Sequence, residues 1–200
     1  RQDTEKDGST KSNKTDFAVM NIPVTIAGGG AAGTGWDLIS IPLTLADTSV
    51  SDALSDVVYE TLYEYNPTTD EWTIPTTLSP LKGYAIKVNS TQIAYFTPIT
   101  STLDTSRAYA APTELALSTK WNLIGINNIS NGQIRDVFGT SLKSGANPTW
   151  SFLYDWGGLA YSIELASATS AKDLAVGTGY FIYVLPDATN RDIPRSGSGR

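Results

Sequence analysis

Gly35-Trp36-Asp37-Leu38-Ile39-Ser40-Ile41-Pro42 occurs a second time in this chain, as Lys120-Trp121-Asn122-Leu123-Ile124-Gly125-Ile126-Asn127. Both stretches have tryptophan, a short polar residue, leucine, isoleucine, a small residue and isoleucine in the same order, without a gap. Such a match is typical of an internal duplication. Because both stretches are apolar and rich in β-branched residues, we expect each to form the buried founding strand of a repeated unit.

Short segments with strand and turn patterns follow both copies in the same order. In the first half we expect strands at 17–26, 60–65, 71–74, 81–88 and 92–96, with a short helix at 50–57 capped by Ser49 or Ser51. Their counterparts in the second half are strands at 115–117, 150–155, 160–163 and 176–184 and a short helix at 134–138. The sequence therefore predicts an all-β fold with minor helix, built from two homologous small sandwich-like or barrel-like units, in tandem or fused. We call residues 16–97 unit 1 and residues 113–188 unit 2, and we expect an arm at 1–15, a linker at 98–112 and a flexible tail at 189–200.

The composition limits the class of function. The chain has 200 residues, 14 Lys and Arg against 20 Asp and Glu, and a formal net charge of −6, which argues against a nucleic-acid partner. It has no cysteine and no histidine, so disulfides, thiolate or imidazole metal sites and Ser-His-Asp catalysis are excluded. Few charges and abundant Thr and Ser are typical of secreted surface proteins, so we expect an extracellular location. No apolar run is long enough to span a membrane, and the start at Arg1 without Met or a signal sequence leads us to expect a processed fragment.

The N-terminal segment has two interpretations. Ala18, Met20, Ile22, Val24 and Ile26 alternate with other residues as in a half-buried strand, and Pro23 places part of it at a sheet edge. The glycine-rich residues 27–35 then form either a loose hairpin loop to the Trp36 strand or a hinge that lets the strand pair with a neighbouring subunit. In the arm before it, Asp3, Glu5 and Asp7 imitate the start of a calcium loop, but its twelfth position is Lys14 rather than an acid. We expect no cofactor, with calcium at these three residues as the alternative.

The repeated stretch, the turn from Tyr65 to Trp72 and the strand Lys82 to Val88 carry a family resemblance. The chain resembles Gly-Trp-Asn-Leu-Ile-Ser-type β repeats of archaeal and bacterial surface-layer-like and adhesin-like proteins, over residues 22–96 and, more loosely, 113–187. The second copy departs from the pattern at Lys120, Gly125 and Asn127, so the turn before its tryptophan is expected to differ. The resemblance implies a building block of large surface proteins and no catalytic set.

Aromatic residues are the main candidates for contacts. Trp36 and Trp121 are expected to be core anchors with Tyr84 and Tyr180 nearby, whereas Trp72 and Trp156 lie at hairpin ends, where an exposed ring can stack on a sugar or fill a neighbour's pocket. Asn13, Asn89 and Asn128 satisfy the N-glycosylation pattern.

Paired carboxylates are the only enzymatic route that the sequence leaves open. The candidates are Glu64 with Asp70 or Glu71, and Asp155 with Glu164, all of which are also explained as solvated or turn-capping residues. We therefore expect a non-enzymatic structural subunit of a cell-surface assembly, such as a surface layer, filament or adhesin stalk, that contacts itself or neighbouring surface proteins and has no membrane span. The alternative is a module that binds carbohydrate or a host surface.

Overall fold

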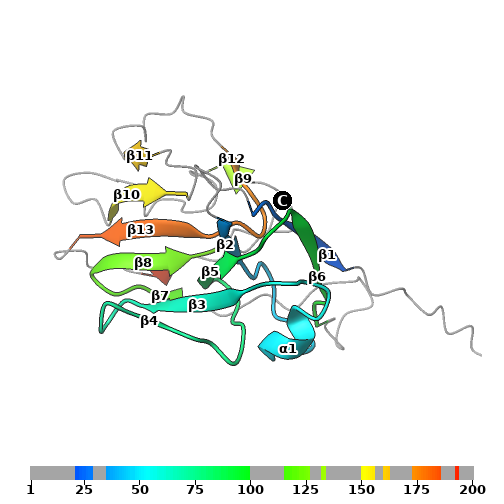
Figure 1. Ribbon diagram of the computed structural model, residues 1–200. Helices are drawn as coiled ribbons and strands as arrows, with labels where there is room; N and C mark the ends of the chain where they lie inside the picture. The colour runs from blue at the N-terminus through cyan, green and yellow to red at the C-terminus, as the bar shows by residue number, and fades with distance from the viewer. Residues whose placement is uncertain are drawn as a thin grey trace, which may run out of the picture.

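The computed structural model describes residues 21–28, 35–99, 115–126, 132–133, 150–155, 160–162, 173–185 and 192–193. Within these residues the regular structure is almost entirely β-strand, and all the strand pairs are antiparallel (Figure 1). The predicted all-β fold is confirmed.

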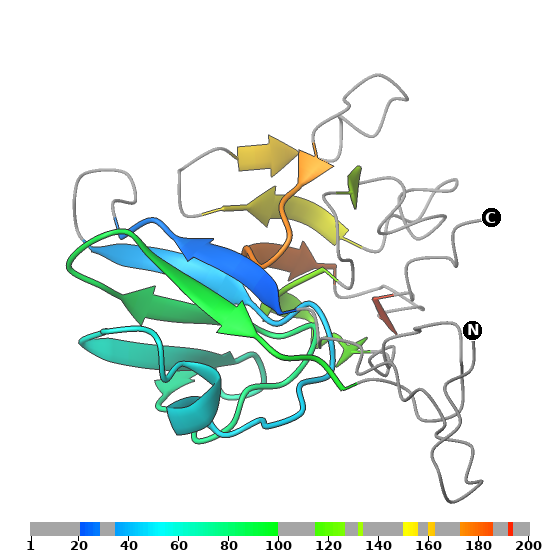
Figure 2. The same ribbon diagram turned by 90° about the vertical axis from the view of Figure 1, so that its right-hand side faces the viewer.

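Unit 1 is a two-layered β-sandwich. Its smaller sheet pairs β1 (Ile22–Ile26) with β6 (Gln92–Phe96), and its larger sheet has the order β2 (Trp36–Ser40), β5 (Gly83–Lys87), β3 (Thr61–Asn66), β4 (Glu71–Thr73). Figure 2 shows the β1–β6 pair lying against the larger sheet. Val24 and Phe96 from the smaller sheet and Ile39, Leu62 and Tyr84 from the larger one meet in a buried core. In β1, β5 and β6 every second residue points into this core, as the period-two pattern predicts, whereas all three residues of β4 are exposed.

One short helix covers an end of this core. α1 (Val50–Ala53) begins at Ser49, whose side chain accepts a hydrogen bond from the Asp52 N–H at 3.3 Å. Of the two predicted caps, Ser49 is therefore the correct one. Val50 and Leu54 are buried against the core, and the chain leaves the helix after one turn. The helix is shorter than the predicted span 50–57.

Unit 2 repeats this arrangement. Its larger sheet has the order β8 (Lys120–Ile124), β13 (Tyr180–Val184), β10 (Trp150–Tyr154), β11 (Ala160–Ser162), and β7 (Leu115–Ala116) pairs with β14 (Asp192–Ile193). β9 (Gly132–Gln133) pairs with β12 (Asp173–Leu174), at the place where Ser49 bridges Thr77 in unit 1. The registers also match, because Ile39 lies opposite Tyr84 and Ile124 lies opposite Tyr180. Two sheets with the same strand order and register support the duplication inferred from the sequence.

Local details recur at matched positions. The Tyr84 hydroxyl accepts a hydrogen bond from the Ser79 N–H at 2.7 Å, and the Tyr180 hydroxyl accepts one from the Ala175 N–H at 2.7 Å. Before the two tryptophans, Gly35 has φ +78° and Lys120 has φ +73°. The turn before Trp121 was expected to differ because Lys120 replaces the glycine, but its backbone adopts the same left-handed conformation. This conformation is strained for a lysine and costs of order 1 kcal/mol or more.

Two connections differ from the expected ones. β1 and β2 belong to different sheets, so the predicted hairpin between Val24–Ile26 and Trp36–Ile41 is wrong, and the glycine-rich segment joins two layers instead. Asp192 and Ile193 fall in the predicted tail but pair with β7. The first residues of the predicted linker belong to unit 1, because Pro98 bridges Leu45 and the Ile99 N–H donates to the Thr44 carbonyl at 2.9 Å.

Candidate functional site

The two units meet through a reciprocal set of backbone contacts, which we call the junction. Ile39 of β2 forms a bridge with Thr178, and Ile124 of β8 forms a bridge with Lys82. Since Ile124 is the counterpart of Ile39, and Thr178 of Lys82, the two bridges are the same contact made twice. This is the pattern of a two-fold interface, in which each partner presents the same surface.

Hydrogen bonds beside the bridges follow the same rule. The Ser40 N–H donates to the Gly177 carbonyl at 2.7 Å, and the Gly125 N–H donates to the Leu81 carbonyl at 2.7 Å. The backbones approach so closely that side chains are excluded: a Cβ on Gly83 would lie 3.0 Å from the Ile124 carbonyl oxygen, and one on Gly179 would lie 2.9 Å from that of Ile39. Backbone hydrogen bonds and bridges therefore join residues of unit 1 directly to residues of unit 2.

Short polar residues after the tryptophans fix the strands at the junction. The Asp37 carboxylate accepts from the Ala27 N–H at 2.6 Å and from the Leu38 N–H at 2.8 Å, and burial raises its pKa above the usual value. The Asn122 amide accepts from the Ser118 N–H at 2.9 Å and donates to the Ser118 carbonyl at 2.8 Å. The aspartate and the asparagine therefore hold the end of the preceding strand in the same way.

Aromatic rings form a continuous row across the outer faces of the two larger sheets. Successive ring centroids lie 5.0 to 6.5 Å apart, the range in which aromatic pairs attract. We call this set the aromatic row: Trp36, Tyr63, Trp72, Tyr65, Phe181, Trp121, Tyr154 and Tyr183. Phe181 of unit 2 contacts Trp72 and Tyr65 of unit 1, so the row crosses from one unit to the other.

The expected role of Trp36 and Trp121 as core anchors is wrong. Both are only half-buried and lie on the outer face, whereas Ile39 and Ile124 on the opposite face enter the cores. Tyr84, expected near Trp36, has its fully buried side chain in the core. Strand alternation explains this, because the tryptophans share a face with Leu38 and Leu123, which are covered by the other unit. Residues 38–41 and 122–126 are buried as predicted, whereas Asp37 is partly buried.

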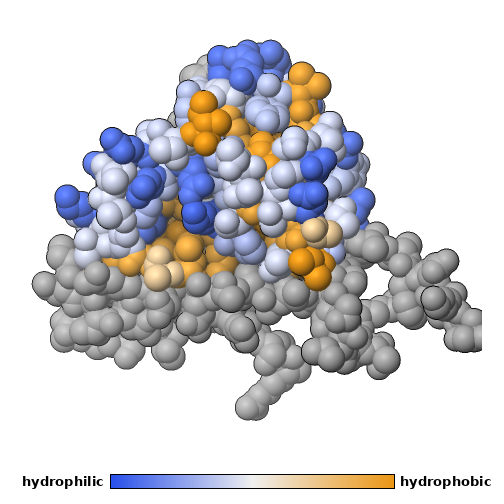
Figure 3. Space-filling view, turned by 90° about the horizontal axis from the view of Figure 1, so that it is seen from below, coloured by the Kyte–Doolittle hydropathy of each residue, from blue (hydrophilic) through white to orange (hydrophobic). Residues whose placement is uncertain are grey.

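Trp72 is the most accessible ring of the row, with 44% of its surface exposed. Tyr65 beside it donates its hydroxyl to Asp70 at 2.5 Å, and burial together with this carboxylate raises the pKa of Tyr65 to about 12. The expected exposure of Trp72 near a hairpin end is confirmed. On the face shown in Figure 3, hydrophobic residues occur in separate patches between polar ones.

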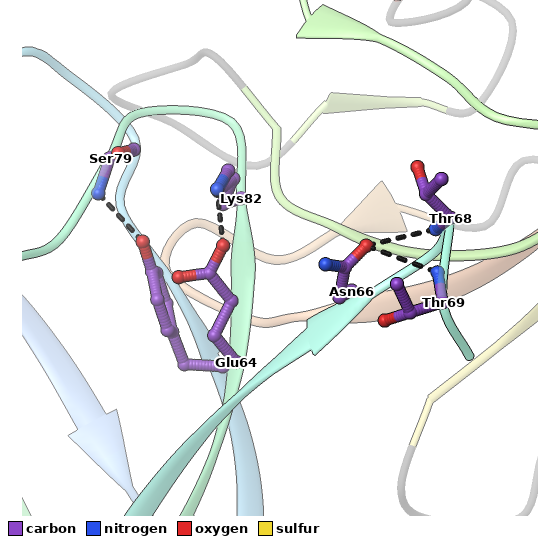
Figure 4. A network of polar contacts seen from close by, with 7 residues as sticks. Glu64, Asn66, Thr68, Thr69, Ser79 and Lys82 are labelled. Carbon is purple, nitrogen blue, oxygen red and sulfur yellow. Dashed lines mark hydrogen bonds and ion pairs between the residues drawn. The ribbon is translucent and has the colours of Figure 1, made fainter. Parts of the chain in front are cut away.

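A small polar pocket of about 180 Å³ lies between β3 and the second unit. Glu64 and Lys82, two of its lining residues, form an ion pair (Figure 4). Asn66 and Tyr65 also line the pocket. The Asn66 side chain accepts from the Thr68 N–H at 2.9 Å and so closes the predicted turn before β4. Glu64 and Asp70, proposed as an acid and base pair, are therefore engaged by Lys82 and Tyr65 respectively.

The matching position in unit 2 lacks the cation. Asp155 is the counterpart of Glu64, and Thr178 takes the place of Lys82. One buried carboxylate oxygen of Asp155 has no hydrogen-bond partner among the described residues.

Only some of the other predicted site residues lie in the part of the chain that the structure describes. Ile22, Val24 and Ile26 form the buried face of β1, and Asn89 is exposed. The remaining candidates lie outside the described residues: Asp3, Glu5, Asp7, Asn13, Ala18, Met20, Asn128, Trp156 and Glu164. The sequence does not single out Phe181. It shows Gly125 only as a departure from the repeated pattern, at the position that Ser40 has in the first copy.

The described residues lack two further kinds of feature. They contain no group of three or more acidic residues arranged to hold a metal ion. They also contain no helix of the length and apolar character needed to cross a membrane.

Comparisons with protein-family models, with curated proteins and with solved structures found no significant match to this chain.

Proposed function

We propose that this chain is a non-enzymatic structural subunit of an extracellular cell-surface assembly. The observation that carries the proposal is the junction, where two similar sandwiches are joined by paired backbone hydrogen bonds into one body. Backbone pairing of this kind suits a protein that transmits load or sets the spacing in an assembly. Such a connection is rigid because it does not depend on side chains that can change rotamer. The acidic composition and the resemblance to surface-protein repeats agree with this role.

Assembly by donation of the N-terminal strand is part of the proposal. β1 pairs with β6 of its own chain, and its other edge has no partner strand among the described residues. Donation would therefore be an exchange, in which β1 of one copy takes the place of β1 in the next. The buried side chains of Ile22, Val24 and Ile26 supply the contacts that such a strand carries with it.

Electron microscopy and sedimentation of the purified chain test the proposal. We expect filaments or sheets from the full chain, and their loss on deletion of residues 1–27. Val24→Asp, which places a charge on the buried face, should block assembly, whereas Thr25→Asp on the exposed face is the matched control. A chain that stays monomeric at high concentration would refute the structural role, and unchanged assembly after the deletion would refute strand donation alone.

Carbohydrate binding is the second candidate, favoured by the exposure of Trp72 within the aromatic row. Tyr63 and Tyr65 flank the ring, and Asp70 and Glu71 add acceptors nearby, a combination that suits the apolar face and hydroxyl edge of a sugar. On a glycan array we expect Trp72→Ala to lose binding and Ile74→Ala, which removes a more exposed aliphatic side chain, to keep it. An array that stays blank with the unaltered chain would eliminate this candidate.

A further inference from the structure

The two backbone bridges of the junction are reciprocal, but counterpart residues differ at some of its positions, such as Leu81 and Gly177. At one such pair the counterparts themselves meet. Ser40 and Gly125 are counterparts, and they face each other across the two-fold arrangement. A Cβ on Gly125 would overlap the Ser40 Cβ and lie 2.5 Å from the Ser40 hydroxyl oxygen. The Ser40 hydroxyl donates to the Thr178 carbonyl at 2.9 Å, and the residue is fully buried. One unit therefore fills a space that the other must leave empty.

This asymmetry discriminates between the possible pairs of units. Two copies of unit 1 in the same geometry would bring two Ser40 side chains into the same space, so that pair is excluded by overlap. Two copies of unit 2 would place glycine against glycine, which leaves the space empty and loses the hydrogen bond to Thr178. Unit 1 with unit 2 is the one combination that is filled without a clash.

We propose that Ser40 and Gly125 determine this pairing, and that the partner the junction accepts from outside is unit 2 of a second copy of this chain. The junction contacts are made by residues of the two units themselves. Residues 100–114 separate the described parts of the two units, and 15 extended residues span up to about 50 Å. Two copies can then exchange their second units and keep every junction contact. The exchange step rests on the proposed function, since it names a surface by which copies join, whereas the pairing rule rests on the geometry alone.

A stability cycle in the full chain tests the pairing rule. Gly125→Ser introduces the overlap and should lower the folding equilibrium constant by about tenfold or more, as overpacked cores do. Ser40→Gly opens the space and removes the buried hydrogen bond, so it should also destabilise the chain. The double variant moves the side chain to the other unit, where the Cβ lies 3.6 Å from the Lys82 carbonyl, the counterpart of Thr178. We expect it to be at least about tenfold more stable than the sum of the single effects predicts, and additive effects would overturn the rule.

Mixing the two single variants tests exchange. If Gly125→Ser chains and Ser40→Gly chains are refolded together, an exchanged dimer contains one unaltered junction and one inverted but filled junction. We therefore expect mixed dimers, detected by native mass spectrometry with a tag on one variant, and no comparable dimers from either variant alone. If Gly125→Ser does not fold by itself, its soluble recovery in the mixture is the expected result.

Each outcome has a distinct meaning. A mixture that remains monomeric, or from which Gly125→Ser is not recovered, overturns exchange. Mixed dimers formed by a chain that shows no assemblies in the electron microscope would support the junction inference and refute the proposed function.

Discussion

Replacing Tyr84 with phenylalanine should change both the stability of the chain and the pH dependence of that stability. The Tyr84 side chain is fully buried, and its hydroxyl accepts the Ser79 N–H at 2.7 Å. Burial, with a smaller contribution from the Glu64 charge, raises its pKa from 10.0 to about 12. Two effects follow, one at neutral pH and one in alkali.

At neutral pH the substitution leaves the Ser79 N–H without its acceptor. A buried donor without a partner costs about 1–3 kcal/mol, so Tyr84→Phe should lower the free energy of unfolding by that amount. Tyr180→Phe is the matched variant in unit 2, because Tyr180 accepts the Ala175 N–H at the same distance. Tyr95→Phe, on the exposed face of β6, removes a hydroxyl without removing a buried acceptor.

In alkali the buried tyrosine destabilises the unaltered chain. The unfolded chain loses the tyrosine proton near pH 10, whereas the folded chain keeps it until about pH 12. Between these values the unfolded state binds fewer protons, so rising pH favours unfolding. A shift of about two units corresponds to about 2–3 kcal/mol lost over this range, and the loss is absent in Tyr84→Phe. The deficit of the variant should therefore shrink as pH rises.

Urea unfolding followed by circular dichroism, at several values between about pH 7 and pH 12, measures both effects. Parallel stability curves for the unaltered chain and Tyr84→Phe above pH 10 would refute the reasoning about burial. Equal stabilities at neutral pH would refute the role of the hydroxyl as an acceptor for Ser79.

Four further substitutions have expected outcomes in the same assay. Asp37→Asn should lower the free energy of unfolding by about 1 kcal/mol through one lost acceptor. Because the pKa of Asp37 is raised in the folded chain, the unaltered chain loses stability as pH rises above the usual aspartate pKa. The difference between the variant and the unaltered chain should therefore shrink as pH rises. Asn122→Asp should cost more, about 1–3 kcal/mol, because it sets a carboxylate against a carbonyl. Ser49→Ala should cost about 1 kcal/mol through loss of the helix cap. Thr178→Lys should stabilise unit 2 by supplying Asp155 with the cation that its counterpart has, and unchanged stability would show that this oxygen is satisfied in another way.

The strands were predictable from sequence because period-two alternation and turn chemistry are local. The hairpin from Tyr65 to Trp72 is an example, since the Asn66 side chain closes the turn on its own neighbours. The pairing of β1 with β6 was not predictable in this way, because alternation in Ile22–Ile26 says which face is buried but not which strand lies beside it. The predicted hairpin is wrong because two strands that are neighbours in sequence, β1 and β2, lie in different sheets.

The burial of the tryptophans was also beyond local reasoning. A strand that begins a buried unit was expected to bury its largest residue, but Trp36 lies on the face that only the second unit can cover. The second unit buries Leu38 and Ser40 but leaves Trp36 half-exposed in the aromatic row. Which side chains on this face are buried therefore depends on the position of unit 2, and the sequence pattern of the strand gives no information about that position.

The repeated stretch does contain a signal for the junction, but only when its copies are compared position by position. Some positions that match in both copies, such as Ile39 with Ile124, are buried in the core of each unit, whereas Leu38 and Leu123 meet between the units. Ser40 and Gly125 differ, although both are small and both sit in buried strands. A two-fold contact between duplicated units brings matched positions together near its axis, so a residue there meets its own counterpart. A difference in size at such a position is expected wherever the two units must pair with each other and not with themselves.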